Sequence, residues 1–92
     1  MTADFSKKTP IAVIGLGYVG LPLAVALARH FLTIGYDVDQ DRISELRDGH
    51  DRTGEIATSD LVASRLTVTG NSGDIAAAEI YIVTVPTPVD KD

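Results

Sequence analysis

A chain of 92 residues in which 45% are hydrophobic can form one small globular domain with a core, but not two such domains. Its net charge of −5 disfavours nucleic acid or an anionic membrane as the main partner, because both prefer a cationic surface. The chain contains no cysteine, which excludes disulfides, thiolate metal sites and a cysteine nucleophile within it, and its two isolated histidines predict no metal site.

The first part of the chain predicts a strand, a glycine-rich turn and a helix. Residues 1–9 are polar and are expected to form a flexible N-terminus. The apolar run over residues 11–14 ends in a glycine and predicts a buried strand. Apolar residues at helical spacing over residues 18–30 then predict a helix packed against a sheet, with Pro22 in its first turn, where a missing N–H costs little.

A second strand and helix follow directly. The strand is expected over residues 31–36, immediately before Asp37. Asp39 can cap the next helix, whose buried stripe would contain Ile43 and Leu46 and which would end at Gly49.

The remaining residues continue the alternation of helical segments and strands. After a polar loop over 49–55, the expected elements are a short helix at 59–65, a strand at 66–69, one or two helical turns at 74–78 and a strand at 79–85. Such alternation predicts an α/β fold, here a partial doubly wound (Rossmann) parallel sheet of about four strands in the order 3-2-1-4. We therefore expect a single domain of this fold class over residues 10–92.

The segment GLGYVG combines three glycines with a strand before it and a helix after it. In a dinucleotide-binding loop, Gly15 would allow the tight turn, Gly17 the close approach of a pyrophosphate and Gly20 the close packing of the helix. The anion would lie at the helix N-terminus, where unpaired N–H groups and the helix dipole favour negative charge. Glycines at this spacing also occur in turns with no ligand, so the loop needs an independent partner.

Asp37 supplies that partner at the carboxyl end of the second predicted strand. It lies within the roughly 20-residue distance expected for the acid that binds the adenosine ribose hydroxyls. A carboxylate there would repel a 2′-phosphate, and no arginine follows directly to offset the repulsion. The sequence therefore predicts NAD rather than NADP as the cofactor.

Two further positions have alternative interpretations. Arg42 could stack beside the adenine, or it could lie on an ordinary solvated helix face. Thr87 follows the last predicted strand, beside the crevice where strand order reverses, so it could hydrogen-bond the cofactor. Alternatively, the prolines around it could simply form a rigid exit from the sheet.

Four segments together resemble the start of a nucleotide-sugar 6-dehydrogenase: IAVIGLGYVGLPLAVALA, GYDVDQDRISEL, GHDRTGE and YIVTVPTPVD. GHDRT favours the branch that oxidises UDP-N-acetylhexosamines over the UDP-glucose dehydrogenases. The resemblance implies that the loop glycines and the backbone N–H groups of Tyr18 and Val19 bind the pyrophosphate. It also implies that Asp37 binds the ribose, that Arg42 lies along the adenine, and that Val85, Pro86 and Thr87 border the nicotinamide half.

Enzymes of this family oxidise a sugar C6 alcohol to the acid with two NAD, using a cysteine thiolate that captures the intermediate aldehyde. This chain has no cysteine, and it lacks the later strands and the sugar-binding domain that the resemblance implies. It is therefore interpreted as an NAD-binding fragment of a UDP-sugar 6-dehydrogenase, inactive by itself, with no catalytic or metal-binding residues of its own.

Two alternatives remain open. The chain could be the N-terminus of a 3-hydroxyacid-type dehydrogenase, or a free-standing NAD-sensing module that regulates a partner. An exposed edge strand favours association, so a homodimer also stays an alternative. The sequence has no apolar leader and no window of roughly 18 apolar residues, so we expect a cytoplasmic protein with no membrane partner. Its expected ligands are the dinucleotide and, in the parent enzyme, a UDP-sugar. No nucleic acid partner is expected.

Overall fold

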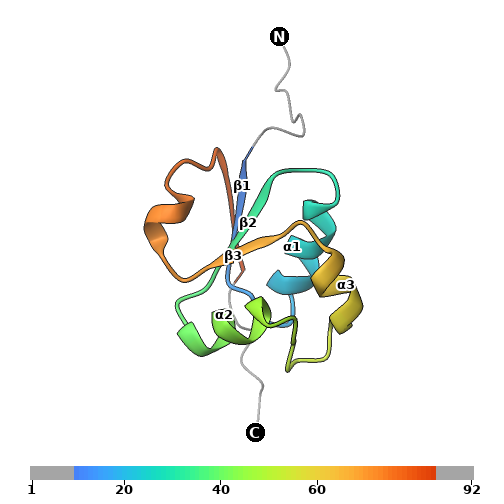
Figure 1. Cartoon of the computed structure of the whole chain (residues 1–92). Coiled ribbons are helices and arrows are strands. Elements are labelled where there is room, and N and C mark those ends of the chain that lie inside the picture. The colour runs from blue at the N-terminus through green and yellow to red at the C-terminus, as the bar shows by residue number, and fades with distance from the viewer. Residues whose placement is uncertain (1–9, 85–92) are drawn as a thin grey trace, which may run out of the picture.

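The computed structural model describes residues 10–84, which form a parallel four-stranded sheet flanked by helical segments (Figure 1). In chain order the elements are β1 (Ile11–Ile14), α1 (Gly20–Ala28), β2 (Thr33–Tyr36), α2 (Gln40–Arg47), α3 (Thr58–Ala63), β3 (Thr67–Thr69), the 3-10 helix η1 (Ser72–Ile75) and β4 (Ile80–Val83). The strand order is β3-β2-β1-β4, which confirms the predicted α/β fold and its order of strands.

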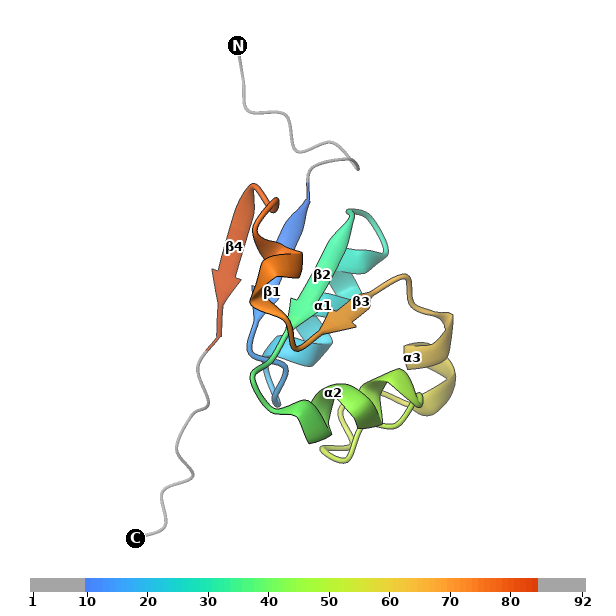
Figure 2. The same cartoon turned by 60° about the vertical axis from the view of Figure 1, so that its left-hand side comes forward.

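The strand register brings three chain segments to one edge of the sheet. β1 pairs with β2 on one side and β4 on the other, and Ile14 is the register partner of both Tyr36 and Val83. Because all pairs are parallel, the residues that follow these three strands emerge together (Figure 2). The carboxyl ends of β1, β2 and β4 therefore surround one common crevice.

The core lies between the sheet and its helices. β1 is a continuous run of apolar residues and is buried over almost its whole length, as is typical of a central parallel strand covered on both faces. In Figure 1, α1 and α3 lie on one side of the sheet and η1 lies on the other. The buried side chains of α1, α2 and α3 that join the core include Leu21, Ala24, Ile43, Leu46 and Leu61.

The predicted ends of the helices are largely confirmed. Pro22 is the third residue of α1, in the first turn. Asp39 caps α2 by accepting hydrogen bonds from the N–H groups of Asp41 and Arg42, which lie 3.0 and 3.3 Å from its Oδ1. Gly49 follows the helix with a φ of +84°, a conformation that favours glycine as the residue ending a helix.

Most element boundaries differ by one or more residues from the sequence-based expectation, and two of these differences have a visible cause. β2 begins at Thr33 rather than Phe31, because the N–H groups of His30 and Phe31 still donate to the carbonyl of Leu27 at the end of α1. The helical turns expected over 74–78 are the 3-10 helix η1, which begins earlier because the Asn71 side chain accepts a hydrogen bond from the N–H of Gly73. Neither shift moves the carboxyl ends of the strands. No helix among residues 10–84 is long and apolar enough to cross a membrane.

Candidate functional site

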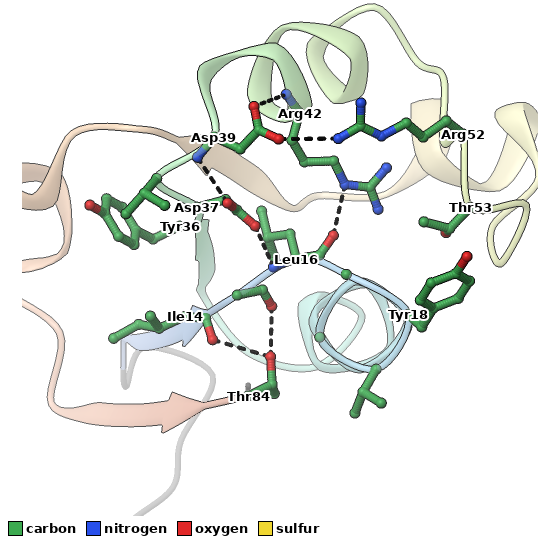
Figure 3. Close-up of a pocket in the computed structure, with 15 residues that line it drawn as sticks. Ile14, Leu16, Tyr18, Tyr36, Asp37, Asp39, Arg42, Arg52, Thr53 and Thr84 are labelled. Carbon is green, nitrogen blue, oxygen red and sulfur yellow. Dashed lines mark hydrogen bonds and ion pairs between the residues drawn. The ribbon is translucent and has the colours of Figure 1, made fainter. Parts of the chain in front are cut away.

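A cavity of about 750 Å³ opens at the carboxyl ends of the strands (Figure 3). Its wall consists of the loop after β1, the segment after β2, the residue after β4 and part of the polar loop after α2. The lining residues are Ile14 to Gly20, Tyr36 to Asp39, Arg42, Arg52, Thr53 and Thr84. The predicted glycine loop and Asp37 thus face one cavity.

The three loop glycines have three different surroundings. Gly15 has a φ of +99°, and a Cβ on it would lie 2.4 Å from the carbonyl oxygen of Thr84. A Cβ on Gly20 would lie 1.7 Å from the carbonyl oxygen of Gly15, so α1 can begin this close to the loop only with glycine there. A Cβ on Gly17 would meet no protein atom within 4 Å. Gly15 and Gly20 are therefore required by the fold, whereas Gly17 leaves space that a ligand can occupy.

The loop also offers free hydrogen-bond donors to that space. Within residues 10–84, the N–H groups of Gly17, Tyr18 and Val19 donate to no acceptor. The side chains of Tyr18 and Val19 are exposed, and α1 begins at the next residue, Gly20. Unpaired N–H groups at the start of a nine-residue helix form a favourable environment for a phosphate.

Asp37 is fixed by the backbone on both of its oxygens. Its Oδ2 accepts a hydrogen bond from the N–H of Leu16 at 2.9 Å, and its Oδ1 accepts one from the N–H of Asp39 at 2.9 Å. A carboxylate can accept about four hydrogen bonds in total. Acceptor capacity therefore remains for hydroxyl groups, and the carboxylate is held in place directly beside the glycine loop.

Thr84 ties β4 to the same loop. Its hydroxyl lies 2.9 Å from the carbonyl of Gly15 and 3.2 Å from that of Ile14, and can donate to either. Thr84 was not among the residues predicted for the site. Its position immediately after a strand that ends at the crevice could have indicated it. The predicted residues Val85, Pro86 and Thr87 lie outside the described residues.

Arg42 is buried, with only 3% of its surface exposed, so the alternative of a solvated helix face is wrong. Its Nε donates to the carbonyl of Leu16 at 2.8 Å, and its Nη1 lies 2.8 Å from Asp51 and 2.9 Å from Glu45. Its buried Nη2 has no hydrogen-bond partner within the described part of the chain. Arg42 therefore braces the glycine loop from a buried position, with one guanidinium nitrogen left without a partner.

Asp51 organises the polar loop that forms the far wall. Its side chain is fully buried and accepts hydrogen bonds from Thr53, from Arg42 and from the N–H groups of Glu55 and Ile56. Burial raises the pKa of Asp51, but the hydrogen bonds from Thr53, Arg42 and Ile56 outweigh burial and lower its pKa to about 2. Asp51 is therefore a charged, structural carboxylate at neutral pH.

This loop was predicted only as a polar connection and a family marker, so Arg52 and Thr53 were missed as residues of the cavity wall. An Asp side chain often accepts a hydrogen bond from the backbone N–H two residues on, as Asp51 does from Thr53, and this could have indicated a folded loop. Which cavity the loop would face depends on its packing against α2.

Within residues 10–84, no group of three or more His, Cys, Asp or Glu side chains could hold a metal ion.

A parallel sheet with this glycine loop, this acid after the second strand and this cavity defines a dinucleotide-binding domain of the Rossmann type. The model of the UDP-glucose/GDP-mannose dehydrogenase family, NAD binding domain, matches residues 9–92. The chain belongs to this family, and the match confirms both the resemblance and NAD as the cofactor of the domain.

Similar proteins point the same way. UDP-N-acetyl-D-glucosamine 6-dehydrogenase of Pseudomonas aeruginosa is 48% identical over 86 residues, which cover 92% of this chain and 20% of that protein. Protein CapL of Staphylococcus aureus is 44% identical over 81 residues, which cover 88% of this chain and 19% of CapL. UDP-N-acetyl-D-mannosamine dehydrogenase of Methanococcus aeolicus is 37% identical over 102 aligned positions, which cover 100% of this chain and 22% of that enzyme. The chain thus spans about a fifth of the length of these curated relatives.

Proposed function

We propose that this chain is the NAD-binding part of a dehydrogenase that oxidises the C6 alcohol of a UDP-sugar to a uronic acid with two NAD. The observation that carries the proposal is the space at Gly17, which lies between unpaired loop N–H groups and the fixed carboxylate of Asp37. This space suits the pyrophosphate and ribose of a dinucleotide. When bound, NAD supplies the hydride acceptor.

The proposal assigns a binding role to each of the site residues. The N–H groups of Tyr18 and Val19 would hold the pyrophosphate, and Asp37 would accept hydrogen bonds from the adenosine ribose. Arg42 lines the same cavity as Asp37, which supports its proposed place along the adenine. The proposed nicotinamide border at Val85 to Thr87 comes from the family resemblance alone.

The substrate is proposed to be a UDP-N-acetylhexosamine, with UDP-glucose as the second candidate. The Pseudomonas and Methanococcus relatives are named for N-acetylhexosamine substrates, and the loop that contains GHDRT is the feature that indicated this branch. A 3-hydroxyacid dehydrogenase finds no support in these names. The cytoplasmic location, the homodimer and the NAD-sensing module remain predictions from the sequence.

Calorimetric titration of the chain with NAD and NADP tests the cofactor site. We expect saturable NAD binding and much weaker NADP binding. Asp37→Ala should reduce NAD affinity at least tenfold, because charge-assisted hydrogen bonds to the ribose contribute about 1.5–3 kcal/mol. Equal binding of NAD by the variant, with circular dichroism unchanged, would contradict the role of Asp37.

The same chain tests the proposed lack of catalysis. It contains no cysteine to capture an aldehyde, so we expect no NADH from NAD and UDP-N-acetylglucosamine, UDP-N-acetylmannosamine or UDP-glucose. NADH formation from any of these sugars would overturn that part of the proposal and would point to catalytic residues within these 92.

A further inference from the structure

A second arginine lies at the cavity, on the loop after α2. The Arg52 side chain is about half exposed, and its Nη2 lies 3.1 Å from Oδ2 of Asp39. Its Nε lies 3.1 Å from Oε1 of Glu45, and its backbone N–H donates to Oε2 of the same side chain at 2.8 Å. Two carboxylates thus hold the guanidinium against α2. Figure 3 shows the contact with Asp39.

This ion pair lies next to the proposed ribose-binding acid. The N–H of Asp39 donates to Oδ1 of Asp37 at 2.9 Å, and the Asp39 side chain continues to Arg52. All three residues line the same cavity. An arginine at this place is chemically suited to bind a phosphate on the ribose, because guanidinium groups bind phosphate oxygens through paired N–H donors.

We propose that the Asp39–Arg52 ion pair determines the choice between NAD and NADP, by keeping occupied an arginine that would otherwise bind a 2′-phosphate. The proposal rests on the proposed function, since it requires the adenosine ribose to lie at Asp37. Asp37 excludes the 2′-phosphate by direct repulsion, and Asp39 excludes it by keeping paired an exposed cation that lines the same cavity. Cofactor selection would then depend on a residue two positions beyond the ribose-binding acid.

The charges around the pair support this assignment. The guanidiniums of Arg42 and Arg52 are outnumbered by four carboxylates, those of Asp37, Asp39, Glu45 and Asp51. A phosphate that approached Arg52 would therefore meet net negative charge. The Asp39–Arg52 contact is itself exposed, and exposed ion pairs contribute little to stability, so releasing Arg52 should cost the fold little.

Asp39→Asn removes the ion pair with Arg52 but keeps the helix cap, so it tests the two roles of Asp39 separately. Asn is as good a cap as Asp, and its amide oxygen can still accept from the N–H groups that Oδ1 serves. Only the oxygen that faces Arg52 changes, to an NH₂ group that cannot accept from a guanidinium. Arg52→Gln, alone and combined with Asp39→Asn, completes a double-mutant cycle.

The probes are ADP-ribose and 2′-phospho-ADP-ribose, which contain the adenosine half of NAD and NADP and no nicotinamide. Dissociation constants are measured by calorimetry for the wild-type chain and the three variants. We expect Asp39→Asn to shift the ratio of the two constants about tenfold toward the 2′-phosphorylated probe, as one new charge-assisted hydrogen bond would produce. In the Arg52→Gln background, the same substitution should shift the ratio less than about threefold.

Each outcome has one meaning. A shift in the Asp39→Asn variant that disappears without Arg52 supports the proposal. An unchanged ratio of dissociation constants in an Asp39→Asn variant that still binds ADP-ribose overturns the proposal. An equal shift of the ratio with and without Arg52 also overturns it, because removal of a negative charge would then explain the whole effect. Failure of the folded wild-type chain to bind ADP-ribose would overturn the proposed function itself, and this inference with it.

Discussion

At the scale of single residues, the glycine loop separates positions that serve the fold from a position that serves the ligand. Gly15 and Gly20 are surrounded by backbone atoms of the loop and of Thr84, so any side chain there must displace the main chain. Gly17 borders only the cavity. Substitution by alanine should therefore affect stability at one position and binding at the other.

We expect Gly20→Ala to lower the free energy of unfolding by more than about 2 kcal/mol, because its Cβ would overlap the Gly15 carbonyl. Gly17→Ala should change the free energy of unfolding by less than about 1 kcal/mol, since its Cβ enters open space. The same methyl group should nevertheless weaken NAD binding at least tenfold by occupying the proposed pyrophosphate position. Urea denaturation and calorimetry measure the two effects.

The pair of variants contains its own control. If Gly17→Ala lost stability as Gly20→Ala does, the open space at Gly17 would not exist in solution. If Gly17→Ala kept both its stability and its affinity for NAD, the pyrophosphate would bind elsewhere.

At the scale of elements, the segment from His50 to Ile56 behaves as a folded part of the cavity wall rather than as a connection. Asp51 holds it by accepting hydrogen bonds from four residues of the loop and α2. Because the Asp51 carboxylate is buried and charged, the loop should be the acid-sensitive element of the domain.

The pKa of Asp51 is lowered from 3.8 to about 2 in the folded chain, so its ionised form stabilises the fold above pH 4. That contribution, about 2 kcal/mol, should be lost as the pH falls from about 4 to about 2. The pKa of Asp39 is lowered as well, first by the N–H of Arg42, but its carboxylate is exposed and should contribute little. Urea denaturation across this pH range measures the loss.

Asp51→Asn is the matched variant for this pH dependence. It keeps one side-chain oxygen but cannot titrate, so its free energy of unfolding should fall less steeply below pH 4. Equal slopes in the two proteins would contradict the assignment. Should the variant fail to fold, carboxyl NMR titration of the wild-type chain decides instead, and a pKa near 3.8 for Asp51 would refute the structural role.

The elements were predictable to the extent that they depend on local patterns. The apolar run of β1 and the Asp39 cap of α2 are encoded within a few residues, and both agree with the structure. Apart from Glu45, which lies one helical turn from Arg42, the partners of Arg42 and Arg52 were not predictable. They lie seven to 26 residues away along the chain, and their meeting depends on tertiary packing. The sequence therefore predicted the glycine loop and Asp37 but missed the wall opposite them.

At the scale of the whole molecule, the sheet ends at β4 with one described neighbour, β1. β4 carries two exposed side chains, Tyr81 and Val83. The Tyr81 hydroxyl donates to the carbonyl of Ile75 at 2.6 Å and so ties η1 to the strand, whereas Val83 is 64% exposed. An apolar edge strand of this kind is a template for pairing with another chain.

We expect the purified chain to associate with increasing concentration, and Val83→Lys to suppress the association, because a lysine on an edge strand must be desolvated when another strand pairs there. Val62→Lys is the matched control, since Val62 is 69% exposed but lies on α3. Sedimentation velocity over a wide concentration range measures both variants. Association that persisted in Val83→Lys, or that Val62→Lys suppressed equally, would assign the contact to another surface. A wild-type chain that stayed monomeric at all concentrations would show that the edge of β4 is protected in solution.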